Sequence, residues 1–153
     1  MGADIDGVRR VRVAAYAIVI RDGHVLLARF VDRFDKKWTL PGGGLDHGED
    51  PVDAVLREVT EETGYECAVD QLLGVDSLRV TEEQPPLDVH AVRIYYATHI
   101  VGGELRHEVG GSTDRAEWFE LTAVPELNRG SLVDQGLRLH QERPAVGRAK
   151  VAP

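Results

Sequence analysis

Apolar residues along this chain gather in short runs separated by turn-forming residues, a pattern typical of strands. Residues 11–20 predict a buried strand, and residues 24–30 predict a second one. Because Asp22 and Gly23 between them favour a tight turn, the two strands are expected to form a hairpin. Further strands are expected at residues 38–40, 67–69, 72–80, 89–100 and 116–121.

Polar and glycine-rich segments separate these strands. Residues 31–37 predict a charged loop, and the sequence Pro-Gly-Gly-Gly at 41–44 is expected to end the strand that precedes it. Residues 81–87 also predict a loop, and the pair Gly102 and Gly103 predicts a tight turn. Loops on a rigid scaffold often carry specificity, so the 31–37 and 81–87 loops are the expected place for substrate selection.

One segment has the periodicity of an amphipathic helix. Its apolar residues recur three and four positions apart and form one face: Val52, Val55, Leu56 and Val59. Asp50 is the expected N-cap, Pro51 suits the first helical position, and Gly64 is a natural stop. The pattern therefore predicts a helix over Pro51–Thr63, and Ser131 is expected to cap a second helix.

The length of 153 residues fits a single domain spanning 1–153, because about 100–200 residues is the usual domain size. The ends, residues 1–10 and 144–153, are expected to be loose tails. Several strands and two helices indicate an α/β architecture, with a mixed β-sheet and helices packed on its faces.

Acidic residues outnumber basic ones by 26 to 18, which gives a net charge of −8. A chain this acidic lacks the basic surface that binds nucleic acids or anionic membranes, so neither partner is expected. No signal segment is found, and the longest apolar run is too short to span a bilayer. With Cys67 as the only cysteine, a cytoplasmic location is expected. A homodimer is plausible, but no sequence feature indicates it.

Three carboxylates cluster at the end of the predicted helix. Glu58 lies three and four positions before Glu61 and Glu62, so their like charges repel and also oppose the helix dipole. A solvated acidic helix end is the common explanation for such a charge run. A divalent cation would remove the penalty, because hard cations take oxygen ligands that include carboxylates.

The residues before the helix favour the metal site. Gly42, Gly43 and Gly44 allow the backbone to approach a ligand closely or to present a carbonyl to a metal. Arg57 is expected to pair with Glu49 and pin the intervening loop, since its planar guanidinium suits a carboxylate.

Residues 43–65 read GGLDHGEDPVDAVLREVTEETGY, and this segment resembles the Nudix box, G-x5-E-x7-R-E-U-x-E-E-x-G-U, where U is a bulky aliphatic residue. The final position differs, because Tyr65 is bulky but aromatic, which affects packing more than chemistry. All other defined positions match: Gly43, Glu49, Arg57, Glu58, Val59, Glu61, Glu62 and Gly64.

The resemblance implies a Nudix fold, an α/β/α sandwich around a mixed sheet, and hydrolysis of a nucleoside diphosphate linked to another group. It implies Mg²⁺ or Mn²⁺ as cofactor and a small-molecule nucleotide diphosphate derivative as substrate. By position in the box, the expected metal ligands are Glu58, Glu61, Glu62 and the carbonyl of Gly42 or Gly43. The residues expected to take part in catalysis are Glu58, Glu62, Arg57 and Glu49.

The identity of the general base stays open. Glu58 is one candidate, and a downstream acid, Glu108, Asp114 or Glu117, is another. The alternative to an enzyme is a non-catalytic Nudix-like nucleotide-binding module, but such modules tend to lose box residues. An isomerase of the same fold that uses cysteine is disfavoured, because the box is intact and Cys67 is misplaced for that role.

The substrate is less well defined than the reaction class. Sequence features typical of ADP-ribose, dinucleoside polyphosphate and NADH enzymes of the family are absent after the box, which lowers these options without excluding them. A nucleoside triphosphate or an ADP-ribose-type substrate is expected. Candidates to stack a base or touch phosphate are the aromatic residues Trp38, Tyr95, Tyr96 and Trp118 and the cations Arg29 and Arg33.

Overall fold

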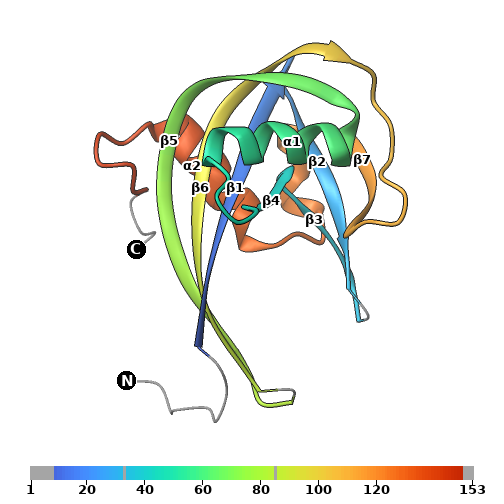
Figure 1. Ribbon diagram of the computed structural model, residues 1–153. Coiled ribbons are helices and arrows are strands. Elements are labelled where there is room, and N and C mark those ends of the chain that lie inside the picture. Colours follow the sequence, from blue (N-terminus) through green and yellow to red (C-terminus); the bar gives the residue numbers. More distant parts are fainter. Residues whose placement is uncertain (1–8, 33, 85, 150–153) are drawn as a thin grey trace.

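The computed structural model describes residues 9–32, 34–84 and 86–149 (Figure 1). Along this part of the chain, the strands and helices follow in the order β1 (Arg9–Arg21), β2 (His24–Val31), β3 (Lys36–Thr39), β4 (Gly42–Gly44), α1 (Pro51–Thr63), β5 (Tyr65–Glu82), β6 (Leu87–Gly103), β7 (Thr113–Glu120), the 3-10 helix η1 (Leu121–Glu126) and α2 (Ser131–Glu142).

Strand β1 lies at the centre of a mixed sheet. It runs parallel to β6 from the pair Arg9 and Asp88 to the pair Val19 and Thr98, and β6 pairs antiparallel with β5. Strand β4 pairs antiparallel with β1 on its other edge. The expected hairpin is confirmed: Asp22 and Gly23 both have positive φ, and β2 continues from this turn to pair with β3 and β7.

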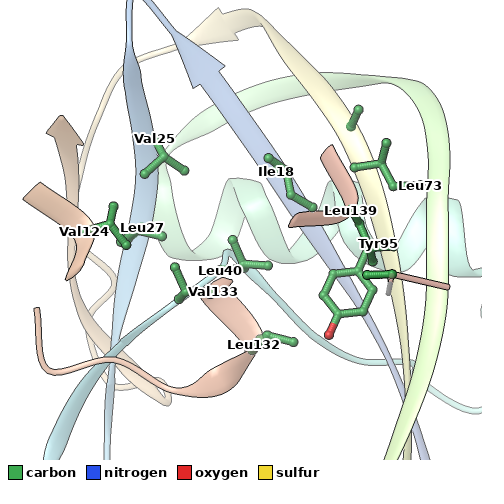
Figure 2. Close-up of a cluster of buried hydrophobic side chains, with 12 residues drawn as sticks. Ile18, Val25, Leu27, Leu40, Leu73, Tyr95, Val124, Leu132, Val133 and Leu139 are labelled. Atoms are coloured by element: carbon green, nitrogen blue, oxygen red, sulfur yellow. The ribbon is translucent and has the colours of Figure 1, made fainter. Parts of the chain in front are cut away.

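The two α-helices cover opposite faces of the sheet that contains β1 (Figure 1). Ala17 and Val19 of β1 face the cluster that includes Val55 and Val59 of α1, whereas Ile18 faces the cluster that includes α2. Figure 2 shows the α2 side, where residues from distant segments meet: Ile18, Leu40, Leu73, Tyr95, Leu132, Val133 and Leu139. Burial on both faces explains why residues 13–20 of β1 are all apolar.

Helix α1 matches its prediction at both ends. The side chain of Asp50 accepts a hydrogen bond of 2.9 Å from the backbone amide of Val52, and Pro51 occupies the first turn. Gly64 has φ 80° and ends the helix in the left-handed region. Local residues therefore determine where this helix begins and ends, which fixes the position of its acidic last turn.

Other boundaries differ from the predictions. The strands expected at 67–69 and 72–80 form one strand, β5, because irregularities in its pairing with β6 absorb the break. Strand β6 runs through Gly102 and Gly103, and β5 and β6 extend into the predicted 81–87 loop. Helix α2 has Gly130 rather than Ser131 as its N-cap, and η1 was not expected.

The ends of the chain also differ from the expected tails. Arg9 and Arg10 belong to β1, where β6 pairs with them, while residues 1–8 and 150–153 lie outside the described part. Before that limit, the carbonyl of Gly147 accepts a hydrogen bond from the amide of Val75, and Ala149 is buried. Among the described helices, none is long and apolar enough to cross a membrane.

Candidate functional site

A cleft of about 470 Å³ opens where the end of α1 meets β4 and the middle of β1. The start of β7 and the segment before it form the opposite wall. The lining residues are Arg12, Tyr16, Phe30, Thr39, Gly42, Gly43, Gly44, Glu58, Glu62, Ser112 and Thr113. The cleft thus contains the glycine run and two of the three helix carboxylates.

The glycine run lets β4 approach both β1 and α1. Gly42 has φ 148°, and a Cβ atom at this position would lie 2.7 Å from the Cα atom of Tyr16. A Cβ atom on Gly43 would lie 2.9 Å from the carboxyl carbon of Glu58. Only glycine fits at position 42, and a side chain at position 43 would displace the Glu58 carboxylate, so the backbone of β4 forms the floor of the cleft next to the carboxylates.

Glu62 is a buried carboxyl group with an exposed fraction of 2%. The amide of Gly42 donates a 3.1 Å hydrogen bond to its Oε2 atom. Burial raises the pKa of Glu62 well above its ordinary value, and the nearby charges of Glu58 and Glu108 raise it further. An anionic Glu62 is therefore costly in the free protein.

Glu58 shares this environment. Burial is the largest cause that raises its pKa, and the charge of Glu61 adds to it, while a hydrogen bond from Arg57 acts in the opposite direction. The guanidinium of Arg57 lies 3.1 Å from Oε1 of Glu58. The cleft thus holds two carboxyl groups that a positive charge from outside the protein would stabilise in the ionised form.

The predicted pair of Arg57 and Glu49 is present. Two hydrogen bonds of 2.8 Å join the guanidinium to the two carboxylate oxygens, and they lower the pKa of Glu49 to about 2. Oε1 of Glu49 also accepts from the amide of Asp46, and Arg57 donates to the carbonyl of Gly44. Arg57 therefore ties the loop before α1, and with it β4, to the helix.

Glu61 lies away from the cleft. Its side chain is 49% exposed, and its Oε2 atom is 3.3 Å from the guanidinium of Arg57. Within residues 9–32, 34–84 and 86–149, no three acidic, histidine or cysteine side chains are grouped in a way that would hold a metal ion. The structure thus brings Glu58 and Glu62 together at the cleft but leaves Glu61 beside them.

Of the three downstream acids, Glu108 is the one that approaches Glu62 closely enough to influence its pKa. The backbone amide of Arg106 donates a 2.9 Å hydrogen bond to the carbonyl of Thr63, which ties this segment to α1. The hydroxyl of Thr113 donates to the Glu108 carboxylate. Asp114 instead pairs with Arg29 and Lys36, and Glu117 pairs with Arg115.

The aromatic residues that the sequence suggested for base stacking lie elsewhere in the fold. Trp38 packs edge-on against Phe119 at 4.6 Å, Trp118 packs on Tyr65, and Tyr95 and Tyr96 are buried. The aromatic side chains that line the cleft are Tyr16 and the 42% exposed Phe30. Sequence reasoning missed these two, because only the pairing of β1 and β2 with distant strands shows which of their residues face the cleft.

The remaining candidates take structural roles or lie outside the description. Arg29 binds Asp114 through two hydrogen bonds of 2.8 Å, and Arg33 is outside the described residues. Cys67 is half-buried, and burial raises the pKa of its thiol to about 11. Such a thiol stays protonated at neutral pH, so it is a packing residue rather than a nucleophile.

A family model described as NUDIX domain matches residues 9–137 of this chain. The chain belongs to the Nudix family. The match begins at β1, includes every residue that lines the cleft, and ends within α2, so the whole site lies inside the Nudix domain.

Several relatives support this assignment. An ADP-ribose pyrophosphatase from Methanocaldococcus jannaschii is 35% identical over 116 residues, which cover 75% of this chain and 65% of that protein. An RNA pyrophosphohydrolase from Acidiphilium cryptum is 32% identical over 127 residues, covering 72% of this chain and 76% of the relative. The chain thus spans less than two thirds of the archaeal relative's length.

Solved structures confirm the fold. A NUDIX hydrolase from Nitrosomonas europaea has a TM-score of 0.72 at 24% identity and covers 92% of this chain and 93% of its own. The NUDIX domain of Shewanella oneidensis NrtR, solved with ADP ribose, has a TM-score of 0.65 at 19% identity, covering 90% and 89%. The predicted α/β Nudix fold with its mixed sheet is therefore correct.

Proposed function

We propose that this protein is a metal-dependent Nudix pyrophosphohydrolase that cleaves the diphosphate bond of a nucleoside diphosphate derivative. The observation that carries the proposal is the cleft with two desolvated carboxyl groups, Glu58 and Glu62, against a floor of glycine backbone. A nucleoside triphosphate and an ADP-ribose-type molecule are the proposed substrate types. Relatives named for cutting pyrophosphate linkages support the class of reaction.

The donor set at the cleft suits Mg²⁺ or Mn²⁺. Among the described residues that line the cleft, the groups able to bind a metal ion offer oxygen atoms. Mg²⁺ commonly binds through one or two carboxylates together with substrate phosphates. Glu58 and Glu62 are the proposed ligands at the cleft, with a carbonyl of Gly42 or Gly43. We retain Glu61 as a further ligand on the strength of the box alone. When bound, the ion would lower the pKa of a water and neutralise charge on the phosphates.

The protein residues take distinct parts in the proposed reaction. A water oxygen bonds to one phosphorus, and the bridging P–O bond breaks with its oxygen leaving on the other phosphate. An ADP-ribose-type substrate then gives two phosphate monoesters, and a nucleoside triphosphate gives a nucleoside monophosphate and pyrophosphate. Glu58 or Glu108 accepts the water proton, and Glu108 is held next to the cleft by a hydrogen bond from Thr113, which lines it. Arg57 and Glu49 hold the loop so that β4 and the carboxylates keep their relative positions.

We further propose that residues 1–153 make up one Nudix domain that acts in the cytoplasm. The single cysteine and the acidic composition support this location.

The experiment is a substrate panel that includes ADP-ribose and ATP, incubated with Mg²⁺ or Mn²⁺ and followed by chromatography of the products. Metal-dependent cleavage at the diphosphate, lost in Glu62→Gln, is the expected result. The exposed acid Asp53, on the same helix, supplies the matched control Asp53→Asn, which should keep its activity. Nucleotide binding without turnover of any compound would overturn the proposal in favour of a binding module.

A further inference from the structure

The cleft contains one cation among the described residues that line it, Arg12 of β1. Its guanidinium lies beside the backbone of Gly44, since a Cβ atom on that glycine would be 3.4 Å from Arg12 Nη2. The other charged lining residues are Glu58 and Glu62. A polyanionic substrate that enters the cleft of this acidic protein therefore meets two carboxyl groups and one positive side chain, Arg12.

Arg12 differs from most arginines of the fold because it has no protein partner in the part of the chain that the structure describes. Paired arginines are the rule elsewhere: Arg29 with Asp114, Arg57 with Glu49, Arg79 with Asp88, Arg93 with Asp76 and Arg129 with Asp134. These pairs hold strands and loops together. Arg12 is exposed, lines the cleft and takes part in no such pair, so its guanidinium is available to bind a ligand.

A second hollow of about 350 Å³ continues from the cleft along the edge of β1. It shares Arg12 and Gly44 with the cleft, and its other lining residues are Arg10, Val11, Val13, Leu45 and Val89. The hollow exists because β4 pairs with β1 at Ala14 to Tyr16, and the last bond joins Leu45 to the carbonyl of Val13. Toward the start of β1, the described residues place no strand on this edge.

Arg10 is the second cation of this hollow. It is exposed and, like Arg12, forms no hydrogen bond or ion pair with residues 9–32, 34–84 or 86–149. Because residues two apart on a strand point to the same face, Arg10 and Arg12 present their side chains in the same direction, with Cα atoms about 7 Å apart. Two cations thus follow one another in a line that leads out of the cleft.

We propose that Arg12 and Arg10 form a phosphate-binding extension of the active site, which this chain uses to select substrates that carry an anionic group beyond the cleaved diphosphate. Arg12 contacts the diphosphate itself, and Arg10 contacts the next anionic group along the substrate. This inference rests on the proposed function and sharpens it: of the two proposed substrate types, it favours a nucleoside triphosphate over ADP-ribose, whose terminal ribose carries no charge.

The first test is calorimetric titration of the full chain in Mg²⁺ with inorganic pyrophosphate and inorganic tripolyphosphate, each recovered afterwards to verify that it is intact. The wild-type protein should bind tripolyphosphate about tenfold more tightly, the gain expected from one charge-assisted contact. Arg10→Gln should remove this preference and leave pyrophosphate affinity within about twofold. Arg12→Gln should weaken both ligands about tenfold, and Arg12→Lys should restore most of the loss, because the charge remains.

The matched control is Arg148→Gln, since Arg148 is exposed and lines neither hollow. It removes the same charge and should leave both affinities unchanged. If Arg148→Gln and Arg10→Gln lose the same amount of tripolyphosphate affinity, the loss is due to net charge alone, and the proposal is overturned. A tripolyphosphate preference that survives Arg10→Gln would also overturn it.

Kinetics on ATP and ADP-ribose separates this inference from the proposed function. Arg10→Gln should raise the KM for ATP about tenfold and that for ADP-ribose less than twofold, with kcat unchanged. If both substrates turn over but neither KM responds to either variant, the arginine extension is wrong and the proposed function stands. If no compound turns over while the tripolyphosphate preference follows Arg10, the proposed function is wrong and the phosphate-binding extension stands.

Discussion

Acidic side chains in two regions of this fold, the β5–β6 pair and the cleft, have different hydrogen-bond partners. On the long β5–β6 pair, Asp88 is 5% exposed and accepts two hydrogen bonds of 2.7 and 2.8 Å from Arg79, which lower its pKa. The partly buried Asp76 accepts two hydrogen bonds of 2.7 Å from Arg93. In the cleft, Glu62 is buried as deeply as Asp88, but its donor is the neutral amide of Gly42, and its pKa is raised.

The difference separates acids that serve the fold from acids that serve a ligand. Burying a carboxylate is costly unless a cation accompanies it, and the sheet places Arg79 beside Asp88 and Arg93 beside Asp76. Arg57 lies next to the cleft, but its two shortest hydrogen bonds go to Glu49. We therefore expect a metal ion, bound together with a phosphate ligand, to offset the free-energy cost of ionising Glu58 and Glu62.

The largest effect is expected from Glu62→Gln, which keeps the shape and the hydrogen bond from Gly42 but removes the charge. Turnover of the best substrate should fall about 10³-fold, because charge that stabilises a transition state in a desolvated site is worth this much. Single-turnover kinetics with saturating metal measures the loss. A variant with more than a tenth of wild-type kcat would show that Glu62 is another structural acid.

The next effect is the mirror image, Asp76→Asn. It leaves the guanidinium of Arg93 without its charged partner, so the free energy of unfolding should fall by about 3 kcal/mol. Urea denaturation measures this change, and kcat should stay within about twofold of the wild type. Loss of kcat in the folded variant would mean that the sheet acids also belong to the site.

Glu49→Gln should have an intermediate effect on turnover, because it loosens the loop that holds β4 without touching the cleft. A loss of about 10–100-fold in kcat is expected, as for residues that orient a metal site indirectly. The pKa of Glu49 is lowered to about 2, so its ion pair stabilises the fold above its unfolded pKa and is lost as the pH falls toward 2. The free energy of unfolding, measured across the pH range, should therefore be higher in the wild type than in the variant at neutral pH. The two values should become equal at about pH 2.

The smallest effect is a gain of stability in Glu62→Gln without metal. A raised pKa means that ionising Glu62 costs stability, so the penalty is absent below its unfolded pKa and grows as the pH rises. At alkaline pH, the variant should melt about 2–4 °C above the wild type, which is the shift that about 1 kcal/mol produces in a protein of this size. In acid, the two proteins should melt at the same temperature. Differential scanning calorimetry across the pH range measures both arms. A variant that melts lower at every pH would contradict the account of a desolvated, unpaired carboxyl.

Sequence predicted what depends on local chemistry. The caps Asp50 and Gly64, the helix between them and the pair of Glu49 and Arg57 follow from residues a few positions apart. The cleft wall could not be predicted in this way. Glu108 influences Glu62 from a segment that the Arg106 amide ties to the end of α1, and Arg12 lines the cleft where β1 pairs with β4. Glu61 shows the limit of the box itself, since its position in the motif does not place its carboxylate in the cleft.

The most direct test of the central claim is Mn²⁺ binding, followed by electron paramagnetic resonance, in wild type, Glu62→Gln and Asp76→Asn. Both variants replace one carboxyl group by an amide, and only Glu62 lies in the cleft. The account predicts that Asp76→Asn binds Mn²⁺ like the wild type, whereas Glu62→Gln binds it at least about tenfold more weakly. Equal Mn²⁺ affinity in wild type and Glu62→Gln would contradict the claim that the carboxyl groups of the cleft bind a cation.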